Sequence, residues 1–207
     1  MSGTEDLFVE PPRIETHRRP FAFARMSEDY AHDLAELAER LAPGLERLPP
    51  KESMLDWAGP FGARFSRYNL FLLDPAFDRL LLALRATYRA LMEAMQIERR
   101  PRLVHAWMNI QKEGERIGRH LHHAPFIGTF AARARGSDTR YGLGRARNDN
   151  DLVVPNRDGQ LIVTPGKLHY HETSPWPRAD APRVTFAFDI VTREGEEPDS
   201  LRLPFDC

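Results

Sequence analysis

The sequence of 207 residues contains a single cysteine, Cys207, which is also its last residue. One thiol excludes an internal disulfide and a cysteine–zinc cluster. The chain also has no charge excess, because 29 Lys and Arg face 30 Asp and Glu, for a formal net charge of −1. Nucleic-acid-binding domains usually carry a basic excess, so we expect no nucleic-acid partner.

Long apolar runs are missing as well. A membrane-spanning helix needs about 20 apolar residues, and the longest candidate, Leu80–Leu84, is bracketed by Asp78 and Arg85. The first ten residues, MSGTEDLFVE, are acidic and have neither the basic nor the apolar part of a signal peptide. We therefore expect a soluble, cytoplasmic protein with no membrane partner.

The hydrophobic pattern changes near residue 100. Before it, one helix is expected after Ser27 and another after Asp74-Pro75, a pair that suits a helix N-terminus. After it, apolar residues alternate with period two, which is typical of strands. The expected strands are Arg102–Gln111, Phe126–Ala134, Gln160–Thr164, Leu168–Glu172 and Arg183–Val191.

This order predicts one α+β domain over residues 1–207, with an antiparallel sandwich or barrel and helices on one sheet face. Residues 1–100 are expected to be a helical half that supports the barrel. Residues 101–192 are expected to form the barrel core, and residues 193–207 a C-terminal tail.

Five of the eight histidines lie between His120 and His171, and four of them form two H-x-H pairs. In a strand, residues i and i+2 point to the same side, so His120 and His122 can share a target, as can His169 and His171. A lone histidine is usually structural, but two such pairs in one small domain favour a metal site. Imidazole binds iron, zinc, copper or nickel, and three ligands leave open positions on an octahedral ion, as a catalytic metal requires.

Arg183 and Thr185 share one face of the last expected strand. A guanidinium and a hydroxyl on an inward face are suited to binding a carboxylate. The alternative is a surface arginine paired with Asp180 or Glu194.

These motifs together resemble the jelly-roll superfamily of 2-oxoglutarate/Fe(II)-dependent oxygenases, and within it a bacterial branch with an H-x-H first motif. The resemblance covers about residues 102–191 and is carried by the following elements in order: Asn109-Ile110, Gly114, His120-x-His122, Gly128, Gly159-Gln160-Leu161 to Pro165, His171 and Arg183-x-Thr185. It implies a double-stranded β-helix. It also implies Fe(II) on His120, His122 and His171, with 2-oxoglutarate as cosubstrate on Arg183 and Thr185.

The sequence departs from the superfamily at His122, because most members have an acidic residue there. A second interpretation takes His122-His123-Ala124 as the H-x-A motif of related halogenases. The distal ligand also stays open between His169 and His171, with His171 in the better register to Arg183.

The cupins share this architecture and offer an alternative function as metal-binding proteins, either 2-oxoglutarate-independent dioxygenases or small-molecule sensors. Gly114 with His120-x-His122, and Gly159 with Pro165-Gly166 and His169, approximate the two cupin motifs. The cupin glutamate after H-x-H is missing, and this resemblance leaves Arg183 unexplained.

The sequence does not identify the substrate or a residue that acts directly in catalysis. A small molecule is the preferred substrate and a protein is the alternative, while the oligomeric state stays undetermined. Residues 133–151, rich in arginine, aspartate and glycine, are expected to be either a lid over the site or a solvated loop.

Overall fold

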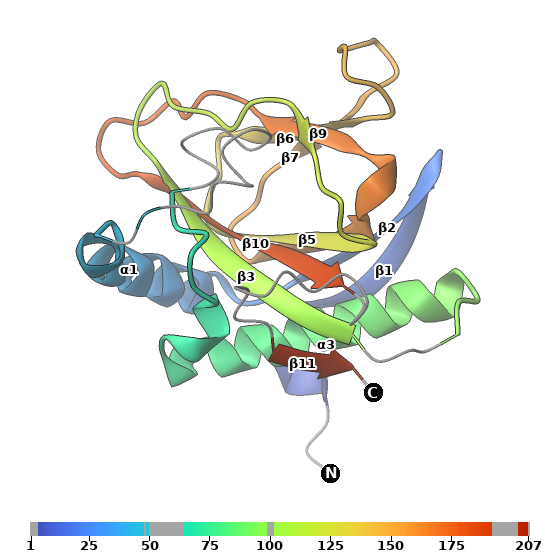
Figure 1. The fold of residues 1–207 in the computed structure, drawn as a ribbon, viewed down its shortest axis with the longest axis horizontal. Helices are drawn as coiled ribbons and strands as arrows, with labels where there is room; N and C mark the ends of the chain where they lie inside the picture. The colour runs from blue at the N-terminus through green and yellow to red at the C-terminus, as the bar shows by residue number, and fades with distance from the viewer. Residues whose placement is uncertain (1–3, 48, 50–63, 99–101, 192–202, 207) are drawn as a thin grey trace.

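The structure is a computed structural model that describes residues 4–47, 49, 64–98, 102–191 and 203–206. Two antiparallel sheets lie one above the other (Figure 1). The larger has the strand order β1-β2-β8-β5-β10-β3-β11 and the smaller has the order β4-β9-β6-β7. The strands are β1 (Glu10–His17), β2 (Arg19–Arg25), β3 (Arg102–Gln111), β4 (His120–Leu121), β5 (Phe126–Arg133), β6 (Asp138–Gly142), β7 (Leu152–Pro155), β8 (Gln160–Pro165), β9 (Tyr170–Thr173), β10 (Arg183–Val191) and β11 (Leu203–Asp206).

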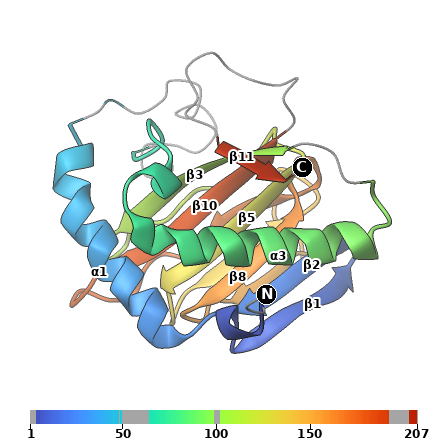
Figure 2. The same ribbon diagram turned by 90° about the horizontal axis from the view of Figure 1, so that it is seen from below.

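Two long helices cover the outer face of the larger sheet, as Figure 2 shows from below. Helix α1 (Glu28–Leu45) begins at Ser27, whose hydroxyl accepts a hydrogen bond from the backbone N–H of Tyr30. Helix α3 (Asp78–Ala94) follows a short 3-10 turn capped by Asp74. Because both caps satisfy N–H groups that a helix start leaves unpaired, the local sequence fixes where this helical layer begins. None of the described helices is long and apolar enough to cross a membrane.

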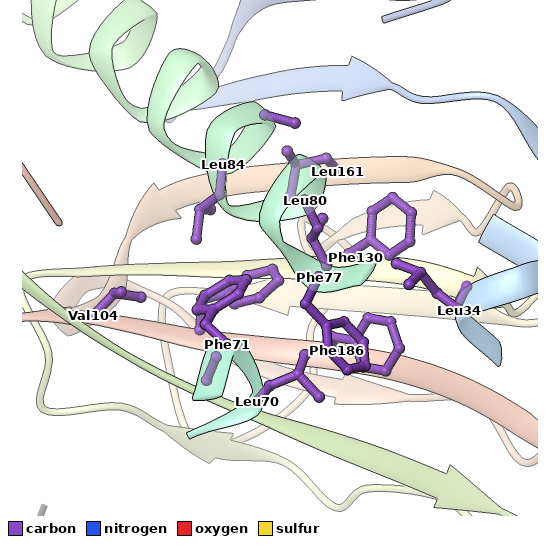
Figure 3. Packing of buried hydrophobic residues seen from close by; sticks show 14 of the residues in the cluster. Leu34, Leu70, Phe71, Phe77, Leu80, Leu84, Val104, Phe130, Leu161 and Phe186 are labelled. Carbon is purple, nitrogen blue, oxygen red and sulfur yellow. The ribbon is translucent and has the colours of Figure 1, made fainter. Parts of the chain in front are cut away.

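The hydrophobic core lies between these helices and the larger sheet (Figure 3). The ring of Phe186 on β10 stands edge-on to Phe77 at 5.5 Å and stacks with Phe130 at 6.1 Å. Leu80 and Leu84 of α3 are fully buried against the same cluster. Each such side chain contributes about 1.5–3 kcal/mol by leaving water, so this layer supplies much of the folding free energy.

Alternation along the strands separates this core from the functional face. On β10, Val184, Phe186, Phe188 and Ile190 belong to the helix-facing core. The residues between them, Arg183, Thr185 and Ala187, line a cavity between the two sheets. The hydrophobic pattern thus points the polar residues of β10 into the barrel.

The α+β class, the antiparallel barrel and the helices on one sheet face are confirmed. The expectation of a wholly helical N-terminal half is wrong for residues 10–25, which form β1 and β2 and extend the larger sheet. Three prolines and several charged residues weaken their strand signal. Backbone pairing with β8 decides their structure.

The expected tail also differs where the structure describes it. Residues Leu203–Asp206 form β11 and pair with β3. Residues 193–202 and Cys207 lie outside the described residues.

Candidate metal centre

Strand pairing brings His120, His122 and His171 together. His120 on β4 lies directly opposite His171 on β9, and His122 follows two residues after His120. The candidate ligand nitrogens of the three side chains all lie within 4.8 Å of one another. All three residues are buried, so the smaller sheet presents a converging set of imidazoles to the barrel interior.

Hydrogen bonds on the far side of two rings fix their tautomers. His120 Nδ1 lies 2.8 Å from the carbonyl oxygen of Gly118, and His122 Nδ1 lies 2.6 Å from Asp189 Oδ1. Each Nδ1 therefore carries the proton, which leaves Nε2 with a lone pair. The two Nε2 atoms are 3.1 Å apart. At this distance the two nitrogens can share a proton or face a common cation.

Burial favours the neutral form of His120 and His171. It lowers the pKa of His120 to about 3, with a further contribution from His122. Burial and then the neighbouring imidazoles place the pKa of His171 well below its ordinary value. The buried Nδ1 of His171 has no hydrogen-bond partner among the described residues. Deprotonated imidazole is the form that binds a metal ion.

The other histidines lie elsewhere. His169 is outside the converging set, with Nδ1 at 3.2 Å from the hydroxyl of Thr164 and its ring 4.8 Å from Phe21. The expectation that it points the same way as His171 is wrong, because His169 ends a 3-10 turn before β9 begins. His123 is exposed, and His105 contacts the Tyr68 carbonyl oxygen. Because His120 joins the cluster, the geometry does not favour the H-x-A interpretation.

Arg183 lines the same cavity as the three histidines and is only 2% exposed. Its Nη1 donates to Gln111 Oε1 at 3.0 Å. The surface alternative is wrong for Asp180, which pairs with Arg178 at 2.5 Å, while Glu194 lies outside the described residues. Burial lowers the pKa of Arg183 to about 10, which still leaves it charged at neutral pH.

Several buried polar atoms of Arg183 and its strand neighbours have no hydrogen-bond partner among the described residues. Arg183 Nε, Gln111 Nε2 and Asn109 Oδ1 are buried and have no partner among the described residues. Native structures rarely leave such atoms unpaired, since each costs about 1–3 kcal/mol. The cavity also has the buried hydroxyl of Thr185 on its wall. The donors among these groups, on Arg183, Gln111 and Thr185, are suited to binding a carboxylate.

Sequence reasoning missed Asp189, whose carboxylate contacts the Nδ1 of His122. Burial favours the protonated carboxyl, but the adjacent His122 more than offsets it, so the pKa of Asp189 lies below its ordinary value. The sequence did indicate that Asp189 points into the barrel, because it shares one face of β10 with Arg183 and Thr185.

The lid expectation for residues 133–151 is wrong in part, because Arg133 ends β5 and Asp138–Gly142 is strand β6. The remaining segment, 143–151, is tied to the smaller sheet. Arg147 Nη2 bonds Glu172 Oε2 at 2.5 Å, and Arg119 bonds the carbonyl oxygen of Gly144 at 2.8 Å. Arg119 also lies 3.0 Å from Asp151. Because Arg119 precedes His120 and Glu172 follows His171, this charged cluster braces the strands that carry the histidines.

No family model and no curated protein matches the chain. Solved structures do resemble it. A Pseudomonas putida prolyl-4-hydroxylase matches with a TM-score of 0.56 and 14% identity, over 89% of this chain and 99% of that one. HygX from Streptomyces hygroscopicus, solved with nickel and 2-oxoglutarate bound, matches with a TM-score of 0.56 and 12% identity, over 84% of this chain and 82% of that one.

The chain has the double-stranded β-helix fold of the 2-oxoglutarate/Fe(II) oxygenases. The α-ketoglutarate-dependent epimerase SnoN from nogalamycin biosynthesis shares it, with a TM-score of 0.55 and 12% identity, over 84% of this chain and 79% of that one. At these identities the likeness establishes the fold. What the chain does must be argued from its own site.

Proposed function

We propose that the protein is a non-heme Fe(II)- and 2-oxoglutarate-dependent dioxygenase that oxidises a small molecule, most simply by hydroxylation. One observation carries this proposal: three converging neutral imidazoles and a buried arginine with unmet donors line the same cavity. A metal site alone accounts for the histidines. A buried guanidinium also requires a negatively charged partner, and an anionic ligand beside the metal would supply it.

The donor chemistry fits Fe(II). His120, His122 and His171 would hold the ion through three neutral nitrogens, a number that leaves positions for a chelating cosubstrate and dioxygen. A cation among the rings would take the place of the proton that the Nε2 atoms of His120 and His122 share at 3.1 Å. The carbonyl of Gly118 and the carboxylate of Asp189 hold those two rings in the binding tautomer.

The cavity chemistry fits 2-oxoglutarate. Arg183 would bind its distal carboxylate, helped by the hydroxyl of Thr185. The free Nε of Arg183 and the amide of Gln111 offer further donors to the same group. Charge-assisted hydrogen bonds of this kind are about twice as strong as neutral ones and fix orientation as well as affinity.

When bound, Fe(II) with 2-oxoglutarate and dioxygen supplies the oxidising chemistry for a C–H bond. The residues of this chain bind, orient and exclude water. Arg183 and the histidines fix the two ends of the cosubstrate, while Trp107, buried between the rings of His105 and His122, closes one wall of the cavity.

We place the substrate in a second cavity of about 290 Å³, since the cavity beside Arg183 is only about 40 Å³. Tyr141 connects this second cavity to the metal centre, because it lines the cavity and its ring lies 5.7 Å from the ring of His171. The rest of the lining consists of His17, Arg18, Phe21, His169 and residues 142–143 and 148–152. Its size suits a small molecule or a single side chain of a protein substrate.

An anaerobic titration tests the proposal. Addition of 2-oxoglutarate to the Fe(II) protein should produce a weak visible charge-transfer band, and admission of air should convert 2-oxoglutarate to succinate. A protein that binds Fe(II) but gives neither band nor succinate would instead be a metal-binding cupin.

The substrate cavity is tested by screening small metabolites for stimulation of succinate formation. Asn150→Trp, which fills that cavity from an exposed position, should abolish the stimulation. It should leave the charge-transfer band unchanged.

A further inference from the structure

The proposed iron site has no charged ligand. The proposed ligands His120, His122 and His171 carry no negative charge, and His122 stands at the position where the resembling enzymes have an acidic ligand. A divalent ion in a buried site without a nearby negative charge pays a large desolvation penalty. We therefore searched the described residues around the three rings for a carboxylate.

Asp189 is that carboxylate, and it contacts His122. Its Oδ1 lies 2.6 Å from His122 Nδ1. The other ring nitrogen of His122, Nε2, faces His120. The side chain of Asp189 is 19% exposed and that of His122 is 4% exposed. Water therefore screens this charge only weakly.

The contact is held rigidly on both sides. The ring of His122 is stacked between Trp107 at 5.9 Å and His171 at 5.0 Å. Asp189 sits within β10, between Ile127 of β5 and His105 of β3 in the strand registers. Ring packing on His122 and strand pairing on both sides of Asp189 therefore hold the carboxylate behind the ring.

We propose that Asp189 supplies, through the ring of His122, the negative charge that an acidic ligand would otherwise give the metal. Asp189 is thus a positioning and charge-compensating residue, which holds His122 in its Nδ1–H tautomer, orients its Nε2 toward the ion and raises its basicity. This inference rests on the proposed function, because it presumes a metal ion on the three histidines.

The same strand then has opposite charges at its two ends. Arg183 lies six residues before Asp189 on β10, about 20 Å along an extended strand. The anionic residue stands behind the metal end of the cavity and the cationic residue at the end that would receive the distal carboxylate. Asp189 thus stands near the positive charge that the metal would bring, and Arg183 near the negative charge that 2-oxoglutarate would bring.

The test is Asp189→Asn, which keeps the shape of the side chain and an oxygen that accepts the His122 proton, but removes the charge. We expect this variant to bind Co(II) about 10–100-fold more weakly than the wild type in anaerobic calorimetry. Asp180→Asn, the same change at an exposed residue paired with Arg178, should change the affinity less than twofold. Equal affinity of Asp189→Asn and wild type would overturn the inference.

A second comparison works even if Asp189→Asn folds poorly. His122→Asp restores a charged ligand and places it beside Asp189, where two carboxylates repel each other. In that background Asp189→Asn should strengthen Co(II) binding, the opposite of its effect in the wild type. A loss of affinity in both backgrounds would overturn the inference. Failure of the wild type to bind Co(II) at all would instead contradict the proposed function.

Discussion

The Nη1 of Arg183 donates to Oε1 of Gln111 across the β10–β3 register at 3.0 Å, and each residue keeps a buried nitrogen that has no partner in the described part of the chain. The hydrogen bond orients the amide of Gln111 so that its Nε2 remains a donor. A guanidinium held in this way is preorganised for a second, anionic ligand, because part of its entropy is already lost before binding.

Arg183→Ala should weaken anaerobic binding of 2-oxoglutarate to the Co(II) protein by about 2–5 kcal/mol, because it leaves a buried carboxylate unpaired. Arg178→Ala is the matched control, since Arg178 is an exposed arginine paired with Asp180. Calorimetry measures both. Unchanged binding in Arg183→Ala would remove the main support for 2-oxoglutarate.

His171→Ala should abolish stoichiometric Co(II) binding, whereas His169→Ala should preserve it, because His169 lies outside the converging cluster. Thermal denaturation gives an independent readout. At a Co(II) concentration of about 100 times Kd the wild type should gain about 2.7 kcal/mol of stability. His169→Ala should keep that gain. A variant of His169 that lost the metal while His171→Ala retained it would reverse the assignment.

Glu172→Gln should destabilise the metal-free protein by about 1–2 kcal/mol at neutral pH, since Glu172 accepts hydrogen bonds from Arg147 and Arg119. The hydrogen bond from Arg147 is the largest cause that lowers the pKa of Glu172. A carboxyl group whose pKa is lowered by folding stabilises the folded state at any pH above its ordinary pKa of 4.5. This contribution is lost as the pH falls through the folded-state pKa.

The difference between Glu172→Gln and wild type should therefore shrink as the pH is lowered below 4.5. Urea unfolding from pH 7 to pH 3.5 measures it. Glu36→Gln, on the exposed face of α1, should show little difference at any pH. A pH-independent loss in Glu172→Gln would point to packing instead of charge.

Gly159→Ala should destabilise the fold by roughly 1–3 kcal/mol, because Gly159 has a φ of +81° and an added Cβ would lie 2.3 Å from the carbonyl oxygen of Met26. Gly44→Ala is the contrasting control. Gly44 lies in α1 with no atom within 4 Å of an added Cβ, so alanine should stabilise the helix by up to about 1 kcal/mol. Melting temperatures of the two variants should move in opposite directions.

Local sequence pattern was enough to predict much of the fold. The caps at Ser27 and Asp74, and the alternation along β3, β5, β8 and β10, predict elements that the structure contains. Strands β1, β2, β6, β7 and β11 were missed, because they are short or interrupted by proline, glycine and charged residues, and sheet pairing supplies their stability.

The sequence by itself determined that His120, His171 and the Arg-x-Thr pair lie on strands, because apolar residues alternate with period two around them. Only the tertiary structure showed that His171, and not His169, lies beside His120 and His122, since that depends on the register of β9 against β4. It also brought Asp189 to His122, 67 residues apart in the chain. Contacts at that separation depend on how sheets close into a barrel, which no local pattern records.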